Sequence, residues 1–168
     1  MNYSRNTRFD SNGNPYQYVG ALDKAAAFII DCLVSAVLCL ILVGMFWIAR
    51  NGLFPGNIKT GSETWGTVVM AISSLGTALY FIGCWLAFSR TLGLKVMEAV
   101  IVDEHTQQKP RFWQFAIRYF GYALFLLPYY LGVFAFAWAL VDKRKQSVHD
   151  KFARTTTVRF IGQIPNPL

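Results

Sequence analysis

The feature that most constrains this chain is a long apolar segment that begins near residue 24 and continues to about residue 49. A bilayer core of roughly 30 Å requires about 20 residues of helix, and this segment offers about 25. We therefore expect a membrane-spanning helix with room for tilt. The segment is too long for the apolar region of a signal peptide, so we interpret it as a retained anchor.

One carboxylate, Asp31, lies inside this segment. An ionised Asp near the centre of a membrane helix costs roughly 3 kcal/mol, so Asp31 should face protein and not lipid. Lys24 shares its helix face, but helical side chains lean toward the N-terminus, so we expect Lys24 to extend to the headgroups. Asp31 then needs a partner from another segment. Two roles remain open for it: a buried structural acid, paired or protonated, and an ion or proton site within the membrane.

The composition agrees with a membrane protein. The 168 residues are 54% hydrophobic, yet the net charge is +7. Lys and Arg flank the apolar spans, which fits anionic headgroups better than nucleic acid. The sequence contains no zinc-finger spacing, phosphate loop, paired carboxylates or nucleophile–base pair, so we expect no enzyme, no cofactor, no metal and no nucleic-acid partner.

A second span is predicted from about residue 66 to residue 89, after a segment rich in Gly and Pro at 50–65. Gly76 and Gly83 are seven residues apart and share one helix face. Small residues let membrane helices approach closely. If the two spans pack antiparallel, Gly83 lies near the depth of Asp31. We therefore predict Gly76 and Gly83 as helix-packing residues, with Asp31 near Gly83.

A third apolar stretch, 112–141, is interrupted by Arg118 and Pro128. Proline removes a helical hydrogen bond, so the stretch should break or kink near its middle. Basic residues on both sides of it favour a cytoplasmic location for both flanks and for the N-terminus. We expect two half-length or tilted helices, or a first half that lies in the interface. Arg118 would then lie in the same layer as Asp31 and is our predicted partner for it.

The polar segments carry weaker signals. Residues 1–20 have few aliphatic side chains and are predicted to be a disordered tail or a segment ordered by a partner. The sequences VMEAVIVD in the 91–111 connection and TTTVRF near the C-terminus are typical of short strands. Ser147 followed by Asp150 indicates the cap of a short helix. We interpret His149, beside Asp150, as part of a cap and ion pair at the membrane surface.

Several motifs together resemble the RDD family of membrane proteins, named for an Arg and two Asp. The family signature R-x-x-A-F-x-I-D is similar to residues 24–31, with Lys24 in place of the Arg. The family's T-L-G-K turn resembles residues 91–95, and its arginine in the third stretch matches Arg118. The ending D-x-x-R-Q-x-x-H-D-x-x-A-x-T resembles Asp142, Lys145, Gln146, His149, Asp150, Ala153 and Thr155, with Arg154 where the family often has Gly.

The resemblance implies an all-α protein of the bacterial inner (plasma) membrane, with a tail at 1–20, a transmembrane domain at 21–160 and a second tail at 161–168. The role of this family is largely unknown; transport has been suggested, and some relatives are linked to sodium–proton exchange. We therefore hold two hypotheses: transport of a small ion or solute by an oligomer, and an accessory or assembly subunit of a larger membrane complex. The charged residues of interest are Lys24, Asp31, Arg118, Asp142, His149 and Asp150.

Overall fold

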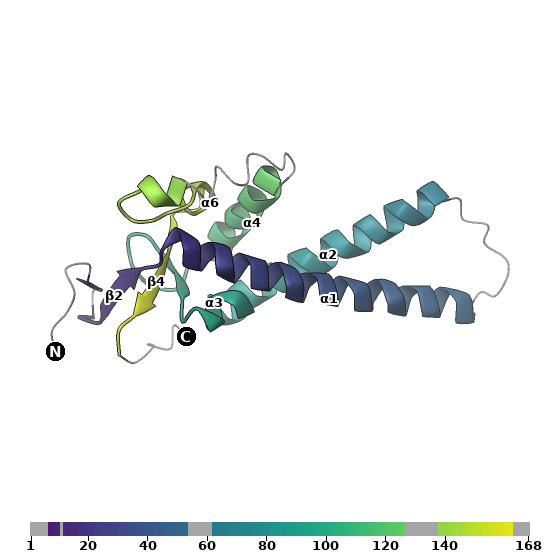
Figure 1. Cartoon of the computed structure of the whole chain (residues 1–168), viewed down its shortest axis with the longest axis horizontal. Coiled ribbons are helices and arrows are strands. Elements are labelled where there is room, and N and C mark those ends of the chain that lie inside the picture. Colours follow the sequence, from purple (N-terminus) through teal and green to yellow (C-terminus); the bar gives the residue numbers. More distant parts are fainter. Residues whose placement is uncertain (1–6, 11, 54–61, 127–137, 163–168) are drawn as a thin grey trace.

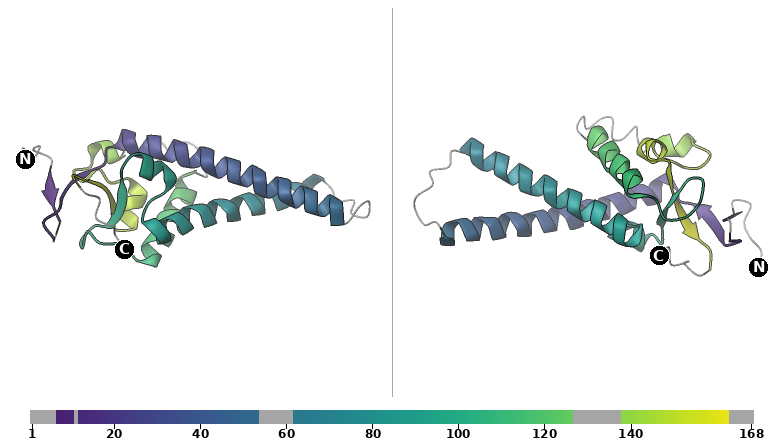
Figure 2. Two further views of the ribbon diagram at one scale, coloured as in Figure 1. Left: turned by 90° about the horizontal axis from the view of Figure 1, so that it is seen from below. Right: turned by 180° about the vertical axis from the view of Figure 1, so that it is seen from behind.

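The computed structural model describes residues 7–10, 12–53, 62–126 and 138–162 of the chain. Two long helices form an arm, and the strands and short helices gather at one end of it (Figure 1). The two further views in Figure 2 show the same division. We call the gathered strands and short helices the compact end. The predicted architecture, an all-α membrane protein with a few short strands, is confirmed.

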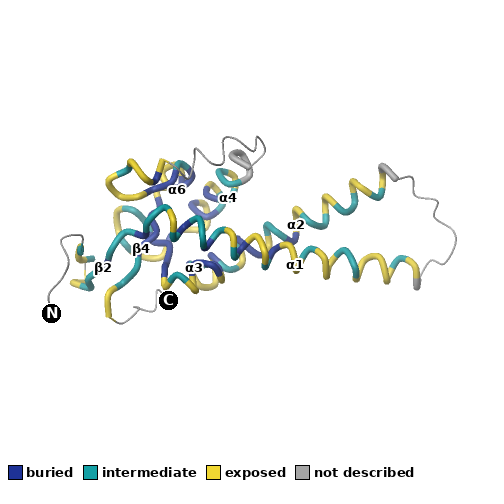
Figure 3. Tube along the Cα trace, viewed as in Figure 1, coloured by how far each residue is buried: buried dark blue, intermediate teal, exposed yellow. Residues whose placement is uncertain are grey.

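The arm consists of α1 (Ala21–Leu53) and α2 (Ser62–Phe88). Both helices are long and apolar enough to cross a membrane, over Ala21–Asn51 and Thr64–Phe88. Only 17% and 11% of the residues in their most apolar windows are buried inside the chain. A helix that is apolar all round and still exposed is expected to face lipid. In Figure 3 most of the arm is yellow or teal, whereas the dark-blue buried segments gather mainly at the compact end.

The two helices of the arm run antiparallel, as predicted, and meet along a polar seam. Ser35 Oγ on α1 lies 3.1 Å from Thr77 Oγ1 on α2. One turn further, Cys39 Sγ donates to the Ser73 carbonyl at 3.5 Å. Gly76 is buried in this contact, and a Cβ at its position would meet side chains of α1. The seam therefore combines hydrogen bonds with close helix approach, as in other membrane helix pairs.

Gly83 does not belong to this seam, which corrects the prediction. Gly83 is exposed, and nothing lies within 4 Å of the position its Cβ would take. The close approach to Asp31 is made instead by Gly93 of α3 (Leu92–Val96). A Cβ on Gly93 would overlap the Ala27 carbonyl of α1. The short helix after α2 thus occupies the place beside α1 that we had assigned to Gly83.

A four-stranded sheet lies at the compact end, in the order β1-β2-β4-β3 with all neighbours antiparallel. The strands are β1 (Arg8–Phe9), β2 (Pro15–Tyr18), β3 (Val100–Asp103) and β4 (Thr155–Phe160). β3 and β4 coincide with the two predicted strand-like segments.

The pairing of β2 with β4 corrects the expectation of a disordered N-terminal tail. Tyr16 pairs with Phe160 and Tyr18 with Val158. Tyr16 is only 5% exposed and lies in a small core with Val100, Val102 and Val158. Cross-strand aromatic pairs stabilise a sheet, and here they replace the missing aliphatic residues.

The third apolar stretch begins with α4 (Phe112–Leu126), and residues 138–141 are again helical. Pro128 and the break predicted around it lie outside the described residues. On α4, Gln114, Phe115 and Arg118 are buried, whereas Phe112 and Phe120 are exposed. This division gives α4 one face toward the core.

The main core lies where α1, α2 and α4 meet. Trp85 of α2 is 1% exposed and stacks on Phe115, with ring centroids 5.9 Å apart. Tyr122 of α4 stacks on Phe28 of α1 at 5.6 Å. The last short helix, α6 (Val148–Phe152), packs against α4, because Gly121 leaves room for His149. These contacts position the charged residues of α1, α4 and α6 around one point.

Candidate functional site

A buried carboxylate, Asp150 of α6, holds two cations. Lys24 Nζ of α1 donates to Asp150 Oδ2 at 2.6 Å, and Arg118 of α4 forms an ion pair with Asp150 Oδ1. Lys24 Nζ also donates to the Lys145 carbonyl at 2.7 Å, and the Ser147 N–H donates to Asp150 Oδ2 at 3.1 Å. Since a buried charge is tolerated only with such partners, Asp150 joins three separate helices. We call Lys24, Asp150 and Arg118 the charge triad.

The charge triad corrects two predictions. Lys24 is 5% exposed and turns to Asp150 instead of the headgroups. Arg118 pairs with Asp150 and also donates to Thr155 Oγ1 at 3.0 Å, so Asp31 is not its ion-pair partner. The reason lies in β4: its pairing with β2 and β3 returns the chain to the base of α1 and places α6 between the two cations.

Asp31 is 3% exposed and is bound by neutral donors. Its carboxylate accepts hydrogen bonds from Tyr80 OH at 2.7 Å, Thr91 Oγ1 at 2.5 Å and the Gly93 N–H at 2.8 Å. These bonds join α1 to α2 and α3. An ionised carboxylate can only accept hydrogen bonds, and the Asp31 carboxylate is the acceptor in all three of these bonds. Thr91 also caps α3, where its Oγ1 accepts from the Leu94 N–H at 3.3 Å.

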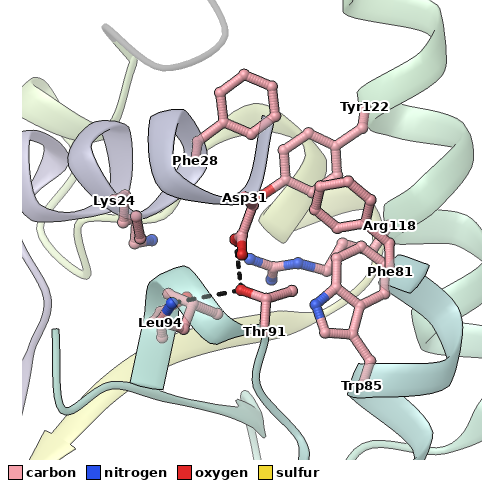
Figure 4. Close-up of a pocket in the computed structure, with 11 residues that line it drawn as sticks. Lys24, Phe28, Asp31, Phe81, Trp85, Thr91, Leu94, Arg118 and Tyr122 are labelled. Carbon is pink, nitrogen blue, oxygen red and sulfur yellow. Dashed lines mark hydrogen bonds between the residues drawn. The ribbon is translucent and has the colours of Figure 1, made fainter. Parts of the chain in front are cut away.

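A small cavity lies between Asp31 and the charge triad, and its lining includes Lys24, Asp31 and Arg118 (Figure 4). Its volume is about 10 Å³, which has room for about one water molecule. Two buried donors of lining residues, Trp85 Nε1 and Arg118 Nε, have no hydrogen-bond partner within the described part of the chain. A polar cavity with such donors is suited to a bound water.

The compact end holds a neutral histidine beside the charge triad. Burial lowers the pKa of His149 to about 3, and its ring packs 4.0 Å from that of Tyr122. Burial alone would raise the pKa of Asp150, but the charges of Arg118 and Lys24 outweigh it and hold that pKa below its ordinary value. The charge triad therefore carries one excess positive charge, which an ionised Asp31 across the cavity would balance.

Asp142, the remaining predicted site residue, lies outside the charge triad. It pairs with Lys151 at 2.6 Å and accepts hydrogen bonds from the backbone N–H groups of Arg144 and Gln146. Gln146 Nε2 donates in turn to the Thr155 carbonyl at 3.0 Å. Asp142 thus shapes the turn that leads into α6.

Sequence reasoning missed four residues that complete the site: Tyr80, Trp85, Thr91 and Gly93. Thr91 and Gly93 belong to the T-L-G turn that we had recognised without assigning it a role. Tyr80 lies on the same face of α2 as the polar residue Thr77, three positions earlier, and that spacing is the signal that would have found it. Trp85 carries no comparable signal.

The fold and the site define a class: a small membrane protein whose helix pair is joined to a polar compact end by buried charges. The family model described as "RDD family" matches residues 18–154, and the chain belongs to this family. The match includes all the charged residues of the site, from Lys24 to Asp150. RDD domains are membrane-associated, in agreement with the two apolar helices. No curated protein and no solved structure matches the chain.

Proposed function

We propose that this protein takes part in moving a small ion across the membrane and that Asp31 is the group that takes up and releases it. The observation that carries this proposal is a polar track that starts at the cavity. From Asp31 it continues along the seam of the arm through Ser35 and Cys39, which face Thr77 and Ser73. At 1.5 Å per residue, this track follows α1 for about 12 Å. Ionisable residues inside membrane helices typically mark ion pathways and proton relays.

The proton is the ion that this site fits best. Tyr80 and Thr91 bind Asp31 through hydroxyl groups, which both donate and accept hydrogen bonds. The cavity beside them has room for about one water molecule. Ca²⁺ and Mg²⁺ take about six or more oxygen ligands at once, whereas a proton needs only a chain of hydroxyls and water.

Transport by this chain requires partners in the membrane, since the two candidate spans found in the described part of the chain do not enclose a path. We propose a homo-oligomer, or a complex with other membrane subunits. We also propose that the compact end, and with it both termini, faces the cytoplasm of a bacterial inner membrane. The positive-inside rule supports this orientation. The basic residues that flank the spans at this end are Arg90, Lys95, Lys109, Arg111, Lys143, Arg144, Lys145, Lys151, Arg154 and Arg159.

Proton flux into proteoliposomes tests this function. A potassium gradient with valinomycin drives uptake, and an enclosed pH dye reports it. We expect flux with the wild-type protein and at least a tenfold loss with Asp31→Asn. Asp23→Asn is the matched control, because Asp23 is on the same helix but is paired at the surface with Arg159 at 3.4 Å. Undiminished flux in a folded Asp31→Asn protein would exclude Asp31 as the ion-binding group.

A second candidate function, an accessory or assembly subunit, is favoured by the open face of α2. Gly83 is exposed with free space at its Cβ position, and the neighbouring side chains of Leu79 and Leu86 are exposed as well. A small residue between apolar ones allows another membrane helix to approach. Mass measurement of the assembly in mild detergent separates the candidates: a fixed ratio to a different membrane protein, combined with no flux from the isolated chain, supports the accessory role.

A further inference from the structure

A second pocket lies where α2 leaves the membrane. It has a volume of about 110 Å³ and is lined by Cys84, Phe88, Arg90, Thr91, Leu92 and Lys95. The apolar span of α2 ends at Phe88, so the pocket extends across the end of the span. Thr91 is the residue whose hydroxyl binds Asp31, which places the pocket beside the site but outside its cavity.

The pocket presents two positive charges without a carboxylate in its lining. Arg90 is half-buried and Lys95 is exposed. Within the described part of the chain, neither side chain forms an ion pair or a hydrogen bond. By contrast, Arg159 is paired with Asp23 and Lys151 with Asp142. Two unpaired cations that line the same pocket repel each other, and an anion bound between them offsets that repulsion.

The rest of the pocket lining is largely apolar, and its exposed residues continue the lipid-facing surface. Phe88 is 64% exposed and Leu92 is 47% exposed. A free phosphate ion gains nothing from such a wall, whereas a phospholipid places its phosphate at the cations and its acyl chains along the apolar residues. The combination of charge and apolar surface at the end of a span therefore distinguishes a lipid from a soluble anion.

We propose that this pocket binds the headgroup phosphate of an anionic phospholipid from the leaflet nearest the compact end. Arg90 and Lys95 contact the phosphate oxygens, and Phe88 and Leu92 contact the first methylene groups of the acyl chains. Because Thr91 joins the pocket to Asp31, the bound lipid holds the turn between α2 and α3 against α1. This inference is independent of ion transport.

The test measures lipid binding to the purified full-length protein in detergent by native mass spectrometry. Phosphatidylglycerol and phosphatidylcholine with identical acyl chains are titrated separately. We expect the wild-type protein to bind phosphatidylglycerol at least tenfold more tightly. A basic residue near an anionic headgroup contributes roughly fivefold in affinity, so Arg90→Gln with Lys95→Gln should weaken binding by roughly 25-fold.

The matched control is the double variant Lys109→Gln with Arg111→Gln, which removes two exposed charges from the same connection. We expect its affinity to stay within twofold of wild type. If the Arg90/Lys95 variant does not fold, Lys95→Glu replaces it, because Lys95 is exposed, and should bind more than tenfold less tightly. Equal affinity for the two lipids, or equal losses in both double variants, would overturn the proposal. Displacement of the lipid by millimolar inorganic phosphate would overturn it in favour of a soluble anion.

Discussion

Asp150 lies between Lys24, whose Nζ is 2.6 Å away, and Arg118, and all three side chains are at least 95% buried. Burying charged groups is costly, and here each charge is compensated by direct contact. The structural consequence is that α1, α4 and α6 meet at one carboxylate. Asp31, by contrast, is held by two hydroxyls and a backbone N–H, and it forms no ion pair with the described residues.

The charge triad predicts which pairs of substitutions are coupled. Asp150→Asn leaves two buried cations without a counter-charge and should lower the free energy of unfolding by about 3–5 kcal/mol. Combined with Arg118→Gln, it should show a coupling energy of about 0.5–3 kcal/mol, because the two side chains contact each other. The measurement is a double-mutant cycle by denaturant unfolding in detergent.

The matched cycle combines Asp31→Asn with Arg118→Gln. Asp31 and Arg118 share the cavity but form no ion pair, so we expect a smaller coupling energy than for Asp150 and Arg118. A larger coupling energy for Asp31 and Arg118 would contradict the assignment of Asp150 as the partner of Arg118.

His149 makes the stability depend on pH. Burial lowers its pKa to about 3, from an ordinary value near 6.5, so the unfolded chain binds a proton more tightly than the folded one. Stability contributed by the neutral imidazole is complete above pH 6.5 and is lost as the pH falls from 6.5 toward 3. At pH 5 the loss should be about 2 kcal/mol. Thermal unfolding at pH 7 and pH 5 measures it.

The control for this pH dependence is the other histidine of the chain, His105, which is exposed. His149→Gln should reduce the difference between pH 7 and pH 5, whereas His105→Gln should leave it unchanged. If His105→Gln alone removed the difference, His149 would not be its source.

At the scale of the elements, two glycines have opposite surroundings: Gly93 is closely packed and Gly83 lies on an open surface. Gly93→Ala places a Cβ against the Ala27 backbone and 2.9 Å from Asp31 Cγ, so α3 must move away from α1. Such overpacking costs about 1–3 kcal/mol, and the Gly93 hydrogen bond to Asp31 weakens as well. Gly83→Ala fills open space on a helix and should stabilise by about 0.5–1 kcal/mol. Thermal unfolding of both variants in detergent shows whether Gly93→Ala lowers the stability and Gly83→Ala raises it.

If the protein assembles through the open face of α2, a bulky residue at position 83 should affect the assembly and not the stability of the single chain. In that case Gly83→Leu should leave the unfolding temperature of the single chain unchanged but reduce the mass of the assembly in mild detergent. A loss of stability in Gly83→Ala equal to that in Gly93→Ala would show that Gly83 is packed after all.

At the scale of the whole molecule, the sheet ties both ends of the described chain to the same side. The Ile161 N–H donates to the Pro15 carbonyl at 2.8 Å, and β2 pairs with β4. We therefore expect cysteines introduced by Glu98→Cys and Ile161→Cys to be protected from an impermeant reagent in intact cells, and Ile58→Cys to be labelled. A background without Cys32, Cys39 and Cys84 is required. Labelling of Ile161→Cys from outside would reverse the proposed orientation.

The sequence by itself determined several of the elements of this protein. The two membrane helices, the strands β3 and β4, and the short helix after Ser147 were all predicted, because apolar length, strand propensity and capping residues are properties of neighbouring positions. The family motifs also identified most members of the site, including Lys24, Asp31, Arg118 and Asp150.

Only the tertiary structure decided which of these residues contact each other. Lys24 and Asp150 are 126 positions apart in the sequence. From the sequence alone, the carboxylate of Asp31 and that of Asp150 are equally suitable partners for a cation. The choice depends on β4, whose pairing with the unforeseen strand β2 brings α6 to the base of α1. Gly93, and not Gly83, lies next to Asp31 for the same reason. Helical spacing shows which residues share one face of a helix, but which segment packs against that face depends on how the whole chain folds back.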